Sequence, residues 1–123
     1  MLLADTENSV EKEIQYLQSF HQDELDGLIF IATIITEQHY ELLQSLNIPV
    51  VILGQKIAEY SCVYHDDYGA AKAMTERLIQ SQKKKVGAIL VTPKDKAAGE
   101  ARQLGYTDAM KGNSIPVEEH RIV

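Results

Sequence analysis

The chain has 123 residues, of which 45% are hydrophobic and 24% charged, the composition of a globular protein and not of a disordered tail, collagen or mucin. Eighteen acidic against twelve basic residues give a formal charge of −6, which argues against these residues binding a nucleic-acid backbone by themselves. The single cysteine, Cys62, cannot form an internal disulfide, and every apolar run is far shorter than the ~20 residues of a membrane span. With no basic leader at the N-terminus, we expect a cytoplasmic protein without membrane contact.

Short apolar runs alternate with segments of helical period along the chain, which predicts βα units around a parallel sheet. The first run, residues 2–4, predicts a short strand, and a helix capped at Asn8 follows, with its apolar stripe from Val10 to Phe20. The continuous apolar run 28–31 predicts a strand covered on both faces. Thr36 is expected to cap a second helix, which Asn47 and Pro49 end.

The second half of the chain continues the same alternation. Strands are predicted at 50–53 and 62–64, and the helix after Asp66 and Asp67 is expected to turn Ala71, Met74 and Leu78 inward. Residues 86–91 predict a long buried strand. A further helix with its stripe at positions 97, 101 and 104, continued by Asp108 or Met110, should end at Gly112, and a last strand begins near 121–123.

Polar residues follow the predicted strands, and ligands of open α/β sheets bind beyond the carboxyl ends of the strands. These segments are 32–33, 54–55, 65–67 and 92–96, which suits a hydroxyl-rich small molecule, although solvated loops have the same composition. Adjacent Asp66 and Asp67 could form a metal or acid–base pair, but we expect at least one to cap a helix. The four histidines have no metal-ligand spacing and are interpreted as surface or loop residues, and Cys62 as a buried, inert thiol.

No nucleophile motif, phosphate loop or dinucleotide fingerprint occurs in the sequence, so we expect no catalytic residues, metal or cofactor. Arg102 lies one turn before Gly105 in a predicted helix. Because glycine costs about 1 kcal/mol in a helix interior, Gly105 indicates the close approach of another element. The Arg102 guanidinium can donate several hydrogen bonds to hydroxyls or carboxylates, or can simply be exposed.

The order of these segments resembles the effector-binding domain of LacI/GalR-type bacterial transcription regulators, relatives of periplasmic sugar-binding proteins. The matching segments cover nearly the whole chain: 3–6 with 11–17, 26–30, 47–52, Asp66 with 69–71, 78–79 with 83–87, and Arg102 with Gly105-Tyr106. The resemblance implies a type I periplasmic-binding-protein-like fold, a parallel three-layer αβα sandwich. It also implies two subdomains, here 1–85 and the beginning of the second at 86–123.

The resemblance further implies an allosteric repressor, in which a sugar or phosphorylated metabolite bound between the subdomains of a homodimer changes the affinity for operator DNA. It places six positions at the pocket: Arg102 as the effector-binding arginine, Asp66 on the hinge side, Thr33 and Gln55 on the first subdomain, and Lys96 and Ala98. Departures from the family pattern at Gly54-Gln55, Asp67, Gln82-Lys83 and Ala98 imply altered pocket chemistry.

By the same resemblance, this chain is expected to begin at the second strand of the first subdomain. The first βα unit, the DNA-binding headpiece and most of the second subdomain would then lie outside it, leaving strands unpaired and apolar faces exposed. Two alternatives remain open: a periplasmic sugar-binding protein of a transport system, and a receiver-like signalling domain. The second fits less well because its acidic pair would come too late in the chain.

Overall fold

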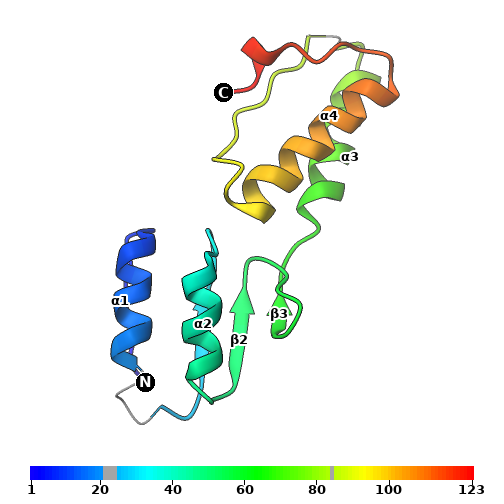
Figure 1. Ribbon diagram of the computed structural model, residues 1–123. Helices are drawn as coiled ribbons and strands as arrows, with labels where there is room; N and C mark the ends of the chain where they lie inside the picture. Colours follow the sequence, from blue (N-terminus) through cyan, green and yellow to red (C-terminus); the bar gives the residue numbers. More distant parts are fainter. Residues whose placement is uncertain (21–24, 84) are drawn as a thin grey trace. The chain divides into compact units, whose positions relative to one another are not determined.

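The computed structural model describes residues 1–20, 25–83 and 85–123 and divides the chain into two compact units, residues 1–64 and 65–123 (Figure 1). His21 and Lys84, about which the sequence made predictions, lie outside the described residues. The subdomain boundary after residue 85 remains a prediction. Among the described residues, no helix is both long and apolar enough to cross a membrane.

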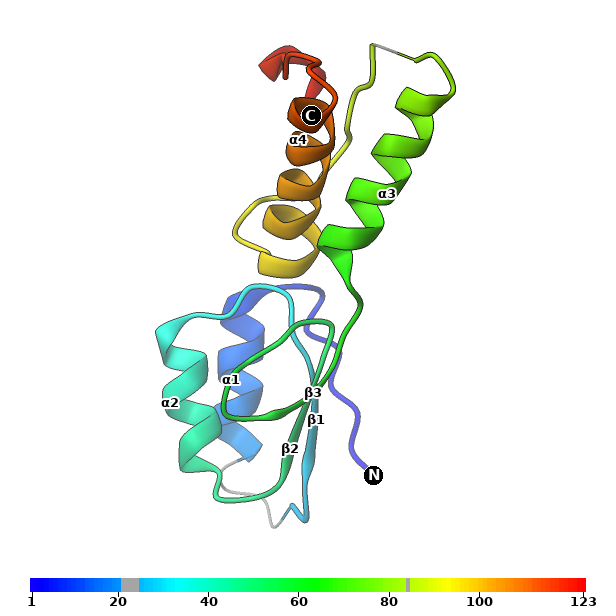
Figure 2. The ribbon, with the colours of Figure 1, turned by 90° about the vertical axis from the view of Figure 1, so that its right-hand side faces the viewer.

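The 1–64 unit is a parallel α/β layer. Its elements are α1 (Val10–Phe20), β1 (Leu28–Ile31), α2 (Glu37–Ser45), β2 (Val50–Leu53) and β3 (Ser61–Val63). The strands form a parallel sheet in the order β1-β2-β3, with Leu28 opposite Val50 and Val51 opposite Ser61. Both helices lie on the same side of this sheet, as Figure 2 shows. The predicted alternation of strands and helices is confirmed for this unit.

The core of the unit lies between the sheet and the two helices, where Leu17, Phe30, Leu43 and Ile52 are buried. On the opposite face of β1, Ile29 and Ile31 are 70% and 69% exposed. The prediction that both faces of this strand are covered is therefore wrong for the described residues, whereas the expected exposure of apolar faces is confirmed. Residues 2–4 form no strand, because none of the described strands pairs with them.

The helix boundaries follow local capping chemistry. Thr36 is the N-cap of α2, as predicted, and Asn47, just beyond the helix end, has a φ of 51°, which asparagine tolerates better than most residues. The cap of α1 is Ser9 instead of Asn8: the Ser9 hydroxyl accepts a hydrogen bond from the Lys12 N–H at 3.3 Å. The Asn8 side chain is directed elsewhere.

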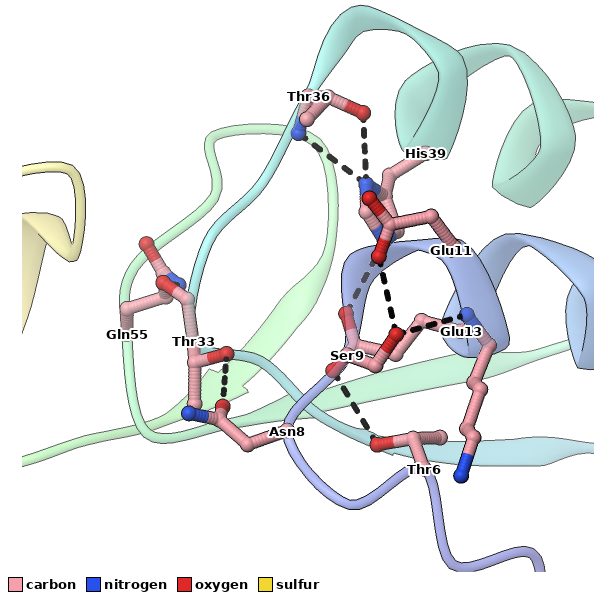
Figure 3. A network of polar contacts seen from close by, with 10 residues as sticks. Thr6, Asn8, Ser9, Glu11, Glu13, Thr33, Thr36, His39 and Gln55 are labelled. Carbon is pink, nitrogen blue, oxygen red and sulfur yellow. Dashed lines mark hydrogen bonds and ion pairs between the residues drawn. The ribbon is translucent and has the colours of Figure 1, made fainter.

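A buried polar network joins α1 to α2 (Figure 3), and it contains a histidine that the sequence placed at the surface. His39 is fully buried and Glu13 is 3% exposed, with His39 Nε2 3.1 Å from Glu13 Oε2. The Thr36 N–H donates to His39 Nδ1 at 3.1 Å, so Nδ1 carries a lone pair and the ring proton is on Nε2, which donates to Glu13. Thr6 donates to the other Glu13 oxygen at 3.4 Å.

The surface interpretation of His39 failed because its partners come from different parts of the chain. Glu13 lies 26 residues away on α1, and the Phe30 ring stacks on the imidazole with centroids 5.8 Å apart. A buried polar group is stable when its hydrogen-bonding atoms are all paired. The imidazole meets that condition on both nitrogens.

The 65–123 unit is built on two packed helices, α3 (Asp67–Gln80) and α4 (Arg102–Gly112), with the π-helix η1 (Lys96–Ala101) leading into α4 and the 3-10 turn η2 (Glu119–Arg121) near the end. A Cβ at Gly105 would collide with the Tyr68 carbonyl oxygen and come within 3.0 Å of the Lys72 nitrogen. The predicted close approach at Gly105 is confirmed, and the approaching element is α3. The Tyr68 hydroxyl reinforces the contact by donating to Asp108 at 3.0 Å.

The π-helical turn also explains why the predicted stripe of this helix is out of phase. Leu104, expected inside, is 51% exposed, whereas Gly105, Tyr106 and Ala109 are buried. Met110, one of the two alternatives for the next inward position, is buried as predicted. A π-turn holds about one residue more than an α-turn. Every position after η1 is therefore displaced by about one residue from a stripe counted at the α-helical period from Ala97.

Two further predictions are wrong for the described residues. Met74 and Leu78 are exposed on α3, because the face that meets α4 carries Ala71 and Thr75 instead. The predicted strand 86–91 is reduced to a single bridge, Ala88 with Ile122, which is parallel. Val86 is buried, but Ile89 and Val91 are exposed, since a strand with so little pairing is not extended into a sheet.

Tyr106 connects α4 to the segment before the bridge: its buried hydroxyl donates to the Val86 carbonyl oxygen at 2.8 Å. Burial raises the pKa of the Tyr106 phenol above its usual value of about 10. The hydroxyl therefore stabilises the fold below about pH 10, and this contribution is lost as the pH rises from there through the folded-state pKa.

Tyr106→Phe is expected to lower the free energy of unfolding of the 65–123 unit by about 0.5–1.5 kcal/mol at neutral pH, because the Val86 carbonyl loses its donor. Urea unfolding at pH 8 and pH 11 checks both effects. The wild type should lose stability between these values more steeply than the Phe variant. Equal slopes for the two proteins would contradict the assignment.

Candidate functional site

At the carboxyl ends of β1 and β2, the structure brings together two of the predicted site residues, Thr33 and Gln55. Gln55 is 6% exposed, and its Nε2 donates to the Thr33 carbonyl oxygen at 2.7 Å. The Thr33 hydroxyl donates to Asn8 Oδ1 at 3.0 Å, and Figure 3 shows these two side chains facing each other. The Thr33 hydroxyl, the Thr33 carbonyl oxygen and the Gln55 side-chain amide therefore already form hydrogen bonds within the protein.

Asn8 is a residue that the sequence analysis missed at this edge, having assigned it to a helix cap. Glu7 and Asn8 both have positive φ, 51° and 56°, and the resulting turn directs Asn8 toward Thr33. Because Asn8 uses its side-chain oxygen to accept from Thr33, its amide nitrogen can still donate a hydrogen bond beside Thr33 and Gln55. The preference of asparagine for the left-handed region was the one signal in the sequence.

A cavity of about 350 Å³ also lies in this unit, between the N-terminal segment, α1 and β1. Its lining is mostly apolar and includes Leu3, Tyr16, Phe20 and Ile29. The lining also includes polar residues, among them Thr33 and Asn8 of the strand edge and Glu13 of the buried network. The cavity is therefore apolar along most of its wall and reaches the polar strand edge at Thr33.

In the 65–123 unit, the adjacent aspartates at the start of α3 have separate roles. Asp66 is the N-cap and accepts the Gly69 N–H at 2.8 Å, which confirms that one of the pair caps the helix. Asp67 is buried and accepts from Arg102 Nε at 2.6 Å. The Arg102 side chain itself is half exposed. The resemblance placed both Arg102 and Asp66 at the pocket, and the side chain that Arg102 contacts is that of Asp67.

The contact follows from the helix packing described above. Tyr68, directly after Asp67, meets α4 at Gly105, one turn beyond Arg102. The close crossing therefore brings the first turn of α3 against the first turn of α4. Arg102 uses Nε on Asp67, and within residues 65–83 and 85–123 its two Nη groups have no hydrogen-bond partner. These groups form a planar set of donors at the start of the helix.

The remaining predicted positions, Lys96 and Ala98, lie on η1. Lys96 is exposed and forms an ion pair with Glu100 at 2.9 Å. The Ala98 N–H donates to Asp95 Oδ1 at 2.8 Å, as does the Ala97 N–H at 3.0 Å. Asp95 thus caps the π-helix, and Lys96 lies on its surface. The six predicted positions are divided between the units, with Thr33 and Gln55 in the first and the other four in the second.

Comparison with known proteins identifies the class. The family model described as "Periplasmic binding proteins and sugar binding domain of LacI family" matches residues 1–123. The chain belongs to this family, and the expected fold class, a periplasmic-binding-protein-like α/β fold with a parallel sheet and flanking helices, is confirmed.

The individual relatives are named as regulators. The chain is 33% identical over 118 residues to the sucrose operon repressor of Staphylococcus xylosus, covering 96% of this chain and 37% of that protein. It is 31% identical over 116 residues to catabolite control protein A of Staphylococcus aureus, covering 93% and 35%. Among solved structures, the transcription regulator CcpA of Lactococcus lactis matches with a TM-score of 0.85 and 30% identity, covering 99% of this chain and 45% of that one. The chain thus spans about a third of the length of these curated relatives.

Proposed function

We propose that the chain is part of the effector-binding domain of a LacI-family transcriptional repressor and binds a small sugar or a related metabolite. The observation that carries this proposal is the placement of Arg102, whose Nη donors are free of partners in the described part of its own unit while Nε is fixed on Asp67. A fixed planar donor pair suits vicinal hydroxyls. The name of a relative, the sucrose operon repressor, supports a sugar as the ligand class.

In this proposal the ligand is held between two subdomains, 1–85 and 86–123 with its continuation. Thr33 and Gln55 contribute from the first, with Asp66, Lys96, Ala98 and Arg102 as the remaining contacts. Ligand binding favours one arrangement of the subdomains in a cytoplasmic homodimer, and this arrangement changes the affinity of DNA-binding headpieces outside these residues for an operator. No chemical step is involved, so the protein is not an enzyme.

The regulator is favoured over a transport protein of the same fold because the relatives with 30% identity or more carry regulator names. A transport protein would bind sugar equally well. DNA binding is thus the property that separates the two, and the experiment needs both readouts.

The test uses the intact protein and measures sugar binding by calorimetry, with sucrose, glucose and fructose as probes, and operator binding by fluorescence anisotropy. We expect at least one of these sugars to bind and to change operator affinity. Arg102→Lys keeps a cation beside Asp67 but loses the planar donor pair, and should weaken sugar binding at least about tenfold, as the loss of one or two hydrogen bonds implies.

Arg77→Lys, a matched change in the last turn of α3, should leave sugar affinity within about twofold of the wild type. Two results would count against the proposal. One is a wild type that binds none of the three sugars. The other is an Arg102→Lys variant that binds and responds like the wild type.

A further inference from the structure

The positive charge of the Arg102 guanidinium is partly compensated by the Asp67 carboxylate. The two residues are 35 positions apart in sequence, and the 2.6 Å contact between Nε and Oδ1 is a charge-assisted hydrogen bond. Asp67 is buried, so its carboxylate is poorly screened by water and its effect on a neighbouring charge is stronger than that of a surface acid. The two Nη groups of Arg102 can therefore donate hydrogen bonds to a ligand, while the Asp67 carboxylate offsets most of the positive charge of the guanidinium.

Neither Asp66 nor Lys96, the charged residues next to Asp67 and on η1, adds net positive charge at Arg102, and the Lys72 ammonium of α3 lies over the Tyr68 ring, 5.8 Å from its centroid. Asp66, adjacent to Asp67, is exposed and carries another negative charge. Lys96, the lysine of η1, is paired with Glu100. The N-terminus of α3 contributes roughly half a positive charge, which is less than the charge of either aspartate. A phosphate or carboxylate brought to the Nη groups of Arg102 would therefore meet the negative charges of Asp67 and Asp66.

We propose that Asp67 is a specificity-determining residue, which compensates the charge of Arg102 while leaving its two Nη groups as donors and so selects uncharged polyhydroxy ligands over phosphorylated or carboxylated ones. The proposal rests on the proposed function for the identity of the site, and it narrows the ligand class to neutral sugars. Asp67 acts as a positioning residue here: it touches Arg102, and Arg102 touches the ligand.

Asp67→Asn is the decisive variant, because the side-chain oxygen still accepts from Arg102 Nε while the negative charge is removed. The probe is inorganic phosphate, added to the full chain at constant ionic strength and followed through the Arg102 Nε–H resonance by NMR. We expect the wild-type resonance to respond only at high phosphate concentration. In Asp67→Asn the apparent Kd for phosphate at Arg102 should fall at least about tenfold, the factor that about 1.4 kcal/mol of relieved repulsion would give.

Glu76→Gln is the matched control, since it removes one negative charge from the same helix α3 without contacting Arg102. If it lowers the phosphate Kd as much as Asp67→Asn does, the effect is one of net charge and the proposal is wrong. The proposal is also wrong if Asp67→Asn leaves the phosphate Kd unchanged while the Nε–H resonance shows that the contact between Arg102 and the substituted side chain persists. Because neither sugar nor DNA is present, this result is independent of the test of the proposed function.

A second variant tests the case in which the contact between Arg102 and residue 67 is lost. Asp67→Ser shortens the side chain and removes the acceptor from Arg102 Nε, so Arg102 should become a free cation and bind phosphate at least as tightly as in Asp67→Asn. Weak phosphate binding by a folded Asp67→Ser variant, with its helix content unchanged by circular dichroism, would overturn the proposal.

Discussion

His39→Ala is expected to lower the free energy of unfolding of the 1–64 unit by about 3–5 kcal/mol, because it leaves a buried acceptor without its donor and a cavity in place of the imidazole. Glu13, 3% exposed, would lose the Nε2–H donor and keep only the longer contact from Thr6. The stack on Phe30 would be replaced by a void in the core. Amide hydrogen exchange of α1 and α2 in the full chain measures the effect for this unit alone.

Two further variants separate the hydrogen bond from the loss of volume. Glu13→Gln keeps an oxygen that accepts from His39 Nε2–H, and should cost less than half as much as His39→Ala. Glu41→Ala, an exposed change on the same helix α2, should stay within about 0.5 kcal/mol of the wild type. A His39→Ala protein with wild-type exchange rates in α1 and α2 would show that the network contributes little.

Gly105→Ala is expected to destabilise the 65–123 unit by about 2–4 kcal/mol, at the upper end of the cost of overpacking. The added methyl would meet backbone atoms of α3, the Tyr68 carbonyl oxygen and the Lys72 nitrogen, as well as the Ala71 methyl. Backbone cannot rotate away as a side chain can, so α3 and α4 must separate. Urea unfolding followed by hydrogen exchange of α3 and α4 measures this cost.

Gly112→Ala provides a control on the same helix. Nothing among the described residues lies within 4 Å of a Cβ built at Gly112, and alanine is the better helix former by about 1 kcal/mol. This variant should be neutral or slightly stabilising. Destabilisation of both variants to the same extent would mean that glycine is needed in α4 for a reason other than its contact with α3.

The parts of the fold that could be predicted were those encoded locally. The strand at residues 50–53 is a continuous apolar run, and α2 is bounded by Thr36 and Asn47, whose conformational preferences act within a few residues. Met74 and Leu78 were misplaced because burial depends on which face of α3 another element covers. The sequence of a helix cannot specify that by itself.

The candidate site shows the same division. The residue types at the strand ends pointed to Thr33 and Gln55, and the glycine in a helix pointed to a close contact at residue 105. The pairing of Arg102 with Asp67 spans 35 residues and arises from the crossing of α3 and α4. The sequence offers no periodicity that distinguishes Asp67 from Asp66, since both are acids at a helix start.

The π-helical turn before Arg102 also bears on how this region can change in evolution. Residues 96–101 hold about one residue more than an α-helical turn needs, while α4 is fixed in place by its contact at Gly105. Deleting one residue from this turn would convert it to an ordinary α-turn and leave Arg102 facing Asp67. Sequences that differ by a single-residue gap within 96–101 can thus retain the same anchor, and an alignment should place that gap in η1 and not in α4.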